Sequence, residues 1–362
     1  MENCILRGYS IKVDSEGIVS DIVCDGSDSI VLAGFCDIHT HGAMGFDISC
    51  CTEESLDAIS KYYLDNGITA FSPTFVATPI ATLDKQLDKL YSLKQKYAVM
   101  LPAHLEGPYI SKAQKGAQPE ENILDEYVEE EHKWFFEKHR HHIGIVTICP
   151  SVKGADKLTK LLVSLGIKVQ AGHDNSNYND IMKAVSNGLD GVTHLGCASS
   201  QTRRDESLEK HLGLTETALY NDNLAVEIIV DGKHLGDDFV KMVHRFKPSD
   251  KIIYVSDSLS TAGMPSGEYV LGDVPVVSDG KVAYLKGMTT LAGSVTNLLK
   301  ALHIAIEYGV SAGDALEAVS TNPRRYMGLP TEIKVGERAD FVILDKDCNL
   351  KQITLGTTTI LK

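Results

Sequence analysis

Short apolar segments alternate along most of the chain with longer segments in which apolar and charged residues recur at helical spacing. Apolar runs that end at polar or glycine residues are typical of buried strands. We expect eight such strands, at residues 30–39, 68–75, 98–106, 143–149, 167–172, 191–195, 224–230 and 251–257. Helices are expected between them, for example at residues 53–66, 83–96, 155–165 and 181–187.

Strands that alternate with helices indicate a parallel α/β fold, and eight repeats favour a closed (β/α)8 TIM-like barrel. An open doubly wound sheet is the alternative. Against it, no Gly-x-Gly-x-x-Gly follows the first strand, and no Walker-type phosphate loop occurs. The 362 residues, of which 43% are hydrophobic, suffice for such a barrel with a small companion domain.

Both ends of the chain carry short alternating strands, at residues 5–6, 9–13, 18–19 and 22–23 and again at 340–345, 353–355 and 357–361. Neither end is long enough to bury a core alone. We therefore expect residues 1–30 and 331–362 to form one small β-sandwich domain beside a barrel at 31–330. A β insertion is expected at about 265–287, after the eighth strand, with a helix at 295–308 behind it.

The composition of the chain excludes several classes of binding partner and indicates its cellular location. The formal net charge of −14 argues against a nucleic acid or an anionic membrane as the binding partner. The start of the chain lacks a secretory signal, and no apolar stretch could span a bilayer. The eight cysteines show no Cys-x-x-Cys spacing, which excludes a cysteine zinc site and a disulfide framework. We expect a cytoplasmic location.

The first expected strand runs into the sequence CDIHTHG at residues 36–42. In an extended strand, His39 and His41 project to the same face. Two neutral imidazoles presented together are suited to bind a metal ion. The alternative is a chance pair at a strand end without a ligand.

Acidic residues and histidines stand at the ends of further strands. The third, fifth and sixth strands finish near Glu106, His173 and His194, the seventh leads to His234, and the eighth ends at Asp257. Each residue alone could be a capping or core group. Because the active sites of parallel barrels lie at the carboxyl ends of their strands, together they are typical of a hydrolytic Zn²⁺-type site with an open coordination position.

Other histidines are assigned differently. His104 is either a supporting group behind the metal site or a satisfied core histidine. A second group lies in or just after a charged helical stretch at residues 129–140, and we expect its members on a solvated surface: His132, His139, His141 and His142.

Several motifs occur in order along the chain after CDIHTHG: HLEGP at 104–108, GHDN at 172–175, THL at 193–195, DGKH at 231–234, SD at 256–257, LAGS at 291–294 and VGERADFV at 335–342. In this order they resemble the N-acetylglucosamine-6-phosphate deacetylase family of the amidohydrolase superfamily. The resemblance covers nearly the whole chain, and the ordered series is far more specific than any single motif.

This resemblance implies the same fold, a homodimer, and one or two divalent metal ions, with Zn²⁺ expected and Fe, Mn or Co as alternatives. Glu106, His173 and His194 would hold the core ion. His39 and His41 would hold a second one. Asp257 would act as general base towards water and then as acid towards the leaving amine.

The resemblance also implies substrate contacts. His234 would bind the sugar phosphate, and further contacts are expected at Ala117, Gln118, Cys197, Ala198, Arg203, Arg204 and Leu291.

Two segments depart from the family. The family has Asn-Ala-Met after the sixth strand and an arginine further on, whereas this chain has GCAS at 196–199 and paired arginines at 203–204, the second of them one place early. The arginines either hold a phosphate or lie in a solvated loop. The family's Lys-Gly-Ala/Thr-His loop ends here in Gln118, which cannot carry a proton charge. The N-acyl substrate and its need for a 6-phosphate therefore stay open.

The sequence thus predicts a metal-dependent hydrolase that removes the acetyl group from an N-acetylated amino-sugar phosphate, giving acetate and the amino-sugar phosphate. One alternative is another amidohydrolase reaction, such as cyclic-amide hydrolysis or deamination. The other is a non-catalytic protein that binds a metal or a sugar phosphate. Asp257 argues against the latter, because a sensor needs no group that transfers protons.

Overall fold

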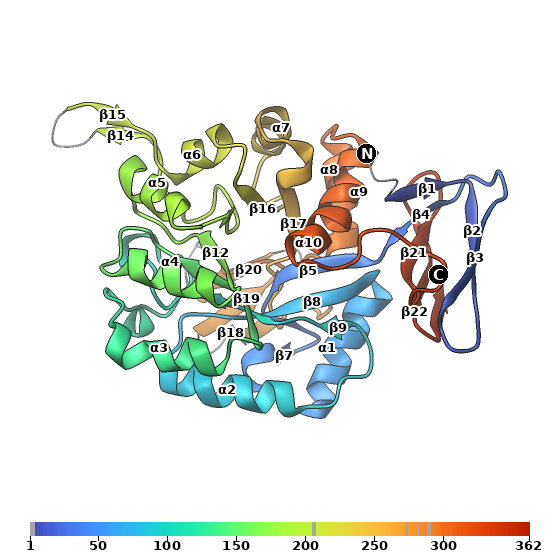
Figure 1. Ribbon diagram of the computed structural model, residues 1–362, viewed down its shortest axis with the longest axis horizontal. Helices are drawn as coiled ribbons and strands as arrows, with labels where there is room; N and C mark the ends of the chain where they lie inside the picture. Colours follow the sequence, from blue (N-terminus) through green and yellow to red (C-terminus); the bar gives the residue numbers. More distant parts are fainter. Residues whose placement is uncertain (1–3, 205–207, 272–273, 281, 288–290) are drawn as a thin grey trace.

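The computed structural model describes residues 4–204, 208–271, 274–280, 282–287 and 291–362. Its body is a barrel of parallel strands, as the hydrophobic pattern predicts (Figure 1). The barrel strands are β5 (Phe35–Thr40), β8 (Ile68–Phe75), β10 (Ala103–Glu106), β11 (Ile143–Ile148), β12 (Lys168–Ala171), β13 (Gly191–Val192), β16 (Ala225–Ile229) and β17 (Ile252–Val255). A short strand, β9 (Val99–Met100), also pairs with β8.

The barrel closes between its first and last strands. Beyond the end of β17, the Asp257 N–H donates to the carbonyl oxygen of His39 at 2.9 Å, and the His41 N–H donates to the carbonyl oxygen of Ser258 at 2.8 Å. These two bonds hold the end of β17 against the end of β5. The His-x-His segment and Asp257, more than 200 residues apart in the sequence, therefore become neighbours.

Helices surround the barrel (Figure 1). They are α1 (Glu53–Asp65), α2 (Ile80–Ser92), α3 (Glu129–Lys138), α4 (Ala155–Ser164), α5 (Tyr178–Ser186), α6 (Leu214–Tyr220), α7 (Asp237–Phe246), α8 (Leu298–Glu307), α9 (Ala312–Val319) and α10 (Thr321–Tyr326). Short 3-10 helices lie at Ile48–Cys50, Lys112–Gln114, Glu120–Asn122 and Ser249–Lys251.

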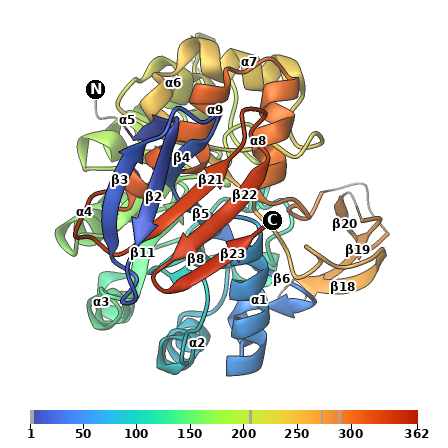
Figure 2. The ribbon, with the colours of Figure 1, turned by 90° about the vertical axis from the view of Figure 1, so that its right-hand side faces the viewer.

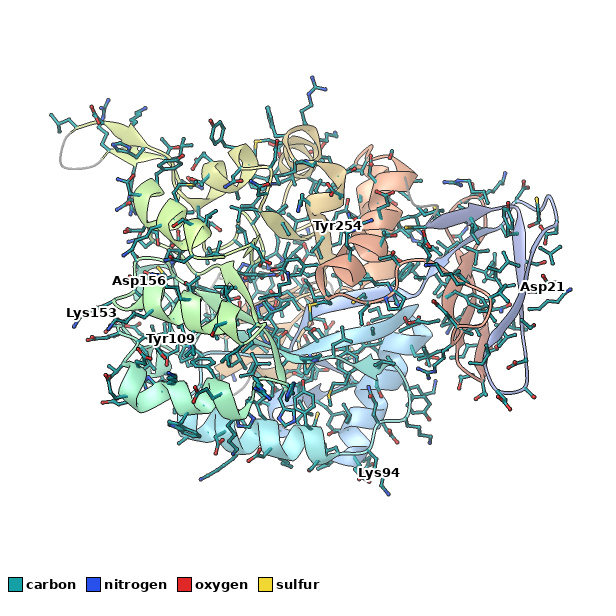
Figure 3. All side chains as sticks on the ribbon, viewed as in Figure 1. Asp21, Lys94, Tyr109, Lys153, Asp156 and Tyr254 are labelled. Carbon is teal, nitrogen blue, oxygen red and sulfur yellow. The ribbon has the colours of Figure 1, made fainter. Side chains whose placement is uncertain are left out.

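Local sequence explains where these helices start and which face they bury. In α1 the Thr52 hydroxyl accepts from the Ser55 N–H while the Ser55 hydroxyl accepts from the Thr52 N–H, a capping box. The apolar face of the helix then buries Leu56 and Ile59. The aromatic side chains of Tyr109 and Tyr254 likewise lie inside, whereas charged groups such as Asp21 and Lys153 lie at the periphery (Figure 3).

The two chain ends form one sheet beside the barrel. Its antiparallel order is β1 (Ile5–Arg7), β4 (Ile30–Ala33), β21 (Asp340–Leu344), β22 (Leu350–Leu355) and β23 (Thr358–Leu361). The hairpin β2 (Tyr9–Val13) and β3 (Val19–Cys24) lies over this sheet, as Figure 2 shows. Val19, Val31 and Phe341 form the apolar layer between hairpin and sheet, which makes the arrangement a small sandwich.

The expected first strand at 30–39 is wrong as a single element, because the chain divides at Gly34. β4 pairs with β1 and β21 in the terminal sheet, whereas β5 enters the barrel. A Cβ at Gly34 would lie 2.0 Å from the Thr69 hydroxyl, so only glycine fits there. Arg324 fixes the junction by donating to the Gly34 carbonyl at 2.9 Å and pairing with Asp340 at 2.5 Å.

The terminal sheet therefore extends to residue 33, past the expected boundary at residue 30. The division of the chain into a barrel domain and a small domain stays a prediction, and residues 1–3 of the expected small domain lie outside the described residues.

The β insertion after β17 is a three-stranded antiparallel sheet of β18 (Gly267–Leu271), β19 (Val274–Ser278) and β20 (Ala283–Leu285). Residues 272–273 and 281 of this stretch lie outside the described residues. Val276 and Ala283 pack with Leu259 and Ala292, next to Val76 and Ala117 at the barrel mouth. The insertion thus forms one wall over the carboxyl ends of the strands.

Candidate active site

A cavity of about 290 Å³ opens at the carboxyl ends of the barrel strands, where parallel barrels place their active sites. It brings together residues that the sequence scatters over separate strand ends and loops. Of the expected site residues, these line it: His41, Glu106, Ala117, Gln118, His173, His194, Cys197, Ala198, His234, Asp257 and Leu291. His39 lies directly behind the wall and is fully buried.

Glu106, at the end of β10, lies at the centre of this group. Its Oε1 is 2.8 Å from the Nε2 of His173 and 2.8 Å from the Nε2 of His194. The Nδ1–H of His173 donates to the Gln114 carbonyl at 2.9 Å, so in the neutral ring the Nε2 that faces Glu106 is a lone pair. A lone pair and a carboxylate oxygen at this distance require a positive charge between them.

His39 and His41 face the same carboxylate from the other side. The Nε2 of His41 is 3.1 Å from Asp257 Oδ1 and 3.4 Å from Glu106 Oε2. The Nε2 of His39 is 3.5 Å from Asp257 Oδ1 and 3.7 Å from Glu106 Oε2, and among the described residues it finds no hydrogen-bond partner. An orphaned imidazole nitrogen aimed at two carboxylates fits a metal ligand.

The charges of the site are coupled. Burial lowers the pKa of His41, but hydrogen bonds to Asp257 and Glu106 outweigh it and raise that pKa to about 9. Burial opposes ionisation of Asp257 and Glu106 as well, yet the neighbouring histidines hold the pKa of both carboxyls below its usual value. The cluster is built to attract positive charge, which a divalent cation supplies.

The residues present therefore fit a metal site of nitrogen and oxygen donors. Glu106, His173 and His194 form one set around a single carboxylate oxygen, and His39, His41 and Asp257 form another within ligand distance of each other. A divalent ion held here lowers the pKa of water and polarises an amide carbonyl.

The backbone is strained where three of these side chains leave it. His173, His194 and Asp257 have φ values of 45°, 29° and 46°. Such left-handed conformations are uncommon outside glycine and are found preferentially at functional sites, where the surrounding structure enforces them. The strain aims these three side chains into one cavity from three different strands.

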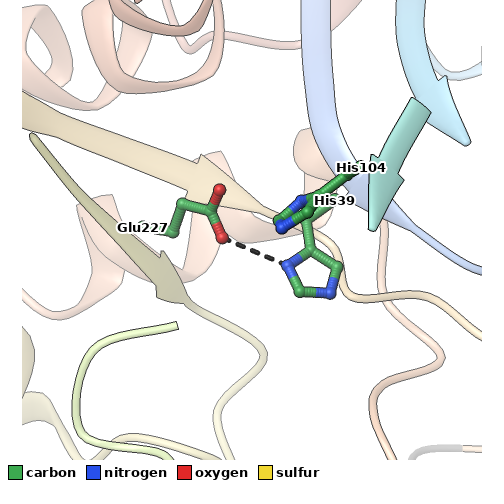
Figure 4. Close-up of side chains that lie close together, drawn as sticks. All are labelled: His39, His104 and Glu227. Atoms are coloured by element: carbon green, nitrogen blue, oxygen red, sulfur yellow. Dashed lines mark hydrogen bonds and ion pairs between the residues drawn. The ribbon is translucent and has the colours of Figure 1, made fainter. Parts of the chain in front are cut away.

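Glu227 on β16 belongs to the site and was missed, because it stands inside the apolar run expected as the seventh strand. It is fully buried, and its Oε2 lies 3.1 Å from the Nδ1 of His39 (Figure 4). The Nδ1–H therefore donates to Glu227, which leaves the Nε2 lone pair to face the cavity. A lone glutamate within LAVEIIV is the signal that could have revealed it.

His104 supports the site from behind, one of the two roles left open for it. Its ring centroid lies 4.6 Å from that of His39, its Nδ1 is 3.1 Å from the Ile38 carbonyl, and its Nε2 is 2.7 Å from the Thr147 hydroxyl. Burial, reinforced by the charge of His39, lowers the pKa of His104 to about 4. A neutral His104 therefore packs beside His39 (Figure 4).

Gln118, which departs from the family pattern, contacts Glu106. Its Nε2 donates to Glu106 Oε2 at 2.6 Å, and its Oε1 accepts from the Ala77 N–H at 2.7 Å. The backbone bond fixes the amide, so the NH2 group faces the carboxylate. One N–H thus orients Glu106, and the second is available to the cavity.

His234, which follows β16, also lines the cavity. Its Nδ1 is 2.7 Å from Asp231 Oδ2, and its backbone N–H donates to the other oxygen of the same carboxyl at 2.8 Å. Burial lowers the pKa of His234, but the bond and charge of Asp231 outweigh it and raise that pKa above its usual value. His234 therefore keeps its proton to higher pH than a free histidine, and a protonated imidazole suits a phosphate.

The structure does not bring Arg203 and Arg204 to the cavity. Both are exposed on β14 (Arg203–Arg204), which pairs with β15 (Lys210–His211) in a hairpin that projects from the body (Figure 1). The Arg203 guanidinium donates to the side chain of Asn175 at 2.5 Å, and Arg204 donates to the Leu208 carbonyl at 2.5 Å. Their expected contact with the substrate stays a prediction.

The sequence of the chain is similar to those of known hydrolases, as the geometry of the cavity suggests. Residues 30–360 match the Amidohydrolase family. The chain is 30% identical to the N-acetylglucosamine-6-phosphate deacetylase of Caenorhabditis elegans, a match covering 93% of this chain and 84% of that protein. The chain belongs to the N-acetylglucosamine-6-phosphate deacetylase family of amidohydrolases. The Bacillus subtilis member of the family is 30% identical, with 90% of this chain and 83% of that protein covered.

Solved structures of family members have the same fold. The N-acetylglucosamine-6-phosphate deacetylase of Thermotoga maritima superposes with a TM-score of 0.86 at 27% identity, over 99% of this chain and 100% of that one. The resemblance stated from the motifs, the barrel and the terminal sheet are thereby confirmed. Within the residues that the structure describes, every helix is too short or too polar to cross a membrane.

Proposed function

We propose that the protein is a metal-dependent deacetylase that hydrolyses the acetamide of N-acetylglucosamine 6-phosphate. The observation that carries the proposal is one cavity lined both by a metal-ligand cluster with Asp257 and by His234, whose imidazole is bonded to Asp231. An amide and a phosphate at two ends of one small substrate match these two chemistries. The curated relatives named for this activity match over most of the chain.

Asp257 performs the proton transfers. Its Oδ1 lies 3.1 Å from the Nε2 of His41, beside the residues that would hold the metal. It takes a proton from the attacking water, whose oxygen bonds to the acetyl carbonyl carbon, and delivers that proton to the amine nitrogen as the carbon–nitrogen bond breaks. Acetate and the amino sugar phosphate are the products. Gln118 keeps Glu106 in place, and the wall formed by the β insertion limits the access of bulk water.

Release of acetate from a panel of N-acetyl amino sugars, each with and without the 6-phosphate, tests this function in metal-reconstituted protein. We expect turnover of N-acetylglucosamine 6-phosphate well above that of the free sugar. Turnover of dihydropyrimidines or purine-like rings without any acetate release would contradict the proposal and favour another amidohydrolase reaction.

The metal is proposed to be Zn²⁺, because imidazole nitrogens and carboxylate oxygens in an open site suit it. Two ions are proposed, one at Glu106, His173 and His194 and one at His39 and His41. The proposal includes a cytoplasmic homodimer in which the projecting β14–β15 hairpin carries Arg203 and Arg204 to the other copy's cavity.

Replacing His234 tests the phosphate contact and predicts a pH dependence. Because the pKa of His234 is raised, the imidazolium persists to higher pH than in free histidine and is lost as pH rises through that raised pKa. The substrate phosphate is a dianion above about pH 7. KM for the 6-phosphate should therefore rise over this alkaline range, while KM for the free sugar stays constant.

The variant His234→Asn should raise KM for the phosphorylated substrate roughly tenfold, the cost of losing a hydrogen bond to a charged group. It should also remove the alkaline rise. Steady-state rates from pH 6 to 10 measure both effects. A wild-type profile retained in His234→Asn would exclude this residue as the phosphate ligand.

Replacing Glu227 tests its action on the second ion. Glu227→Gln keeps the shape but no longer fixes the proton on His39 Nδ1, because an amide can accept or donate. The affinity of the second ion should fall about 10- to 100-fold, the usual cost of losing a buried carboxylate behind a metal-binding histidine. Metal content per chain at graded free Zn²⁺ measures this, and the ion at Glu106 should be retained.

A further inference from the structure

A second cluster of metal-ligating groups lies away from the barrel mouth, between α2 and the end of α3. It consists of Asp88, His139 and His142, whose ligand atoms all lie within 4.8 Å of one another. None of the three lines the cavity described above. The sequence places His139 and His142 on a solvated surface, which is wrong: His139 is 1% exposed and His142 is half-buried.

The spacing of the two imidazoles fits a tetrahedral metal. The Nδ1 atoms of His139 and His142 stand 3.3 Å apart and face each other. Two nitrogens at the Zn–N bond length of about 2.0–2.1 Å on a tetrahedral ion are separated by roughly 3.3–3.4 Å. The structure therefore holds both ligands at the separation that an ion would impose.

The proton positions also suit a ligand pair. The Nε2 of His139 lies 2.8 Å from Asp84 Oδ1, so the Nε2–H donates to that carboxylate and the Nδ1 carries the lone pair. A carboxylate behind a histidine in this way orients metal ligands. The Nδ1 of His142 faces that lone pair at 3.3 Å, so the His142 ring donates its Nδ1–H to it.

The surroundings fix the rings and supply negative charge. His142 stacks on Tyr91 of α2, with ring centroids 4.5 Å apart and planes at 4°. His139 follows the last residue of α3, where the helix dipole favours a cation. Lys138 opposes a cation here, together with the neighbouring His141, but its Nζ bridges Asp84 at 2.6 Å and Asp88 Oδ2 at 2.7 Å. Asp88 Oδ1 remains for an ion.

We propose that Asp88, His139 and His142 bind a zinc-type divalent cation that fastens the end of α3 to α2, with the fourth position open to water because Asp88 is exposed. Binding requires only that the proton of His142 move from Nδ1 to Nε2, since both ring nitrogens can carry it. The ion would stabilise the folded chain by mass action, because the three ligands converge only when both helices are in place.

Equilibrium dialysis of chelator-stripped, full-length protein against graded free Zn²⁺ tests this site, with metal per chain as the readout. His142→Gln removes a nitrogen ligand, and Asp88→Asn removes the carboxylate of the other helix without touching the histidines. The matched control is His141→Gln, an exposed neighbour whose ring accepts from Arg140 Nε at 3.1 Å.

Wild type and His141→Gln should each bind one more ion per chain than His142→Gln. Asp88→Asn should lower the affinity for that additional ion about tenfold or more. Titration with Co²⁺ should show the visible absorption of one tetrahedral ion lost in His142→Gln. Acetate release should be the same in all four proteins at saturating metal. Equal metal content in wild type, His142→Gln and Asp88→Asn overturns the proposal.

Discussion

Asp257→Asn should lower kcat for acetate release by roughly 10²–10⁴-fold, the range attributed to a positioned general acid–base group. Asparagine keeps the size of the side chain, but it cannot accept the proton of the attacking water or return it to the amine. KM should change little, because the proposed contact that holds the substrate phosphate is made by His234 and not by Asp257. Steady-state acetate release with zinc-saturated protein measures the effect.

Metal content must be determined on the same Asp257→Asn preparation, since Asp257 Oδ1 also lies 3.1 Å from the Nε2 of His41. A suitable control is Asp190→Asn, which changes a carboxylate paired with Lys168 and Tyr326, outside the cavity lining. It should leave kcat unchanged. Wild-type turnover in metal-replete Asp257→Asn would rule out the assigned mechanism.

Glu106→Gln should abolish binding of the core metal ion at the concentrations that saturate wild type, and acetate release with it. The Oε1 of Glu106 is the atom shared by His173 and His194, and the neutral amide of glutamine removes the negative charge around which both rings are arranged. We expect affinity to fall by more than the roughly 100-fold upper range seen for supporting groups, because Glu106 is itself a ligand. Metal per chain and acetate release provide the two readouts.

Glu106→Gln and Glu227→Gln form a matched pair, since each replaces a buried glutamate by its amide. The first should lose the ion at His173 and His194, and the second should weaken the ion at His39. A Glu106→Gln protein that keeps its full metal content and activity would show that the core ion is bound elsewhere.

Much of the fold could be predicted from the sequence, because hydrophobic periodicity reports directly on burial. Most expected strands and helices lie within a few residues of the observed ones, but the expected strands at 30–39 and 98–106 each correspond to two observed strands. The expected strand at 30–39 was predicted as one element because only Gly34 separates its two halves. Ile30–Ala33 and Phe35–Thr40 are each buried at every position. Which sheet each half joins depends on contacts with Thr69 and Asp340, far away in the sequence.

The residues of the candidate site that stand at the carboxyl ends of barrel strands could be predicted from the sequence. Strand ends meet at one mouth, so His39, Glu106, His194 and Asp257 could be grouped before any coordinates. For Glu227 the sequence offers only the sign of a lone charge in an apolar run, and its partner is known once His39 is seen 3.1 Å away. Hydrogen-bond partners depend on rotamers that local sequence does not determine.

His139 is a second residue whose surroundings could not be predicted from local sequence. Its position at the end of a charged helix predicts exposure, yet the contact of α3 with α2 buries it beside Asp84. The resemblance to the family predicts that Arg203 and Arg204 contact the substrate. Within one chain their guanidinium groups instead donate to Asn175 and to the Leu208 carbonyl. The local pattern of apolar and polar residues does not indicate contacts between separate helices or strands, or between two copies of the chain.

The terminal sheet has a consequence for how the chain is made. β4, which leads directly into the segment carrying His39 and His41, lies between β1 and β21. During synthesis β1 is available early, whereas residues 340–344 leave the ribosome only after all the barrel strands. The nascent chain therefore carries an unpaired edge on β4 until β21 has been made, and a chain that stops before residue 340 should keep this edge exposed and prone to aggregation.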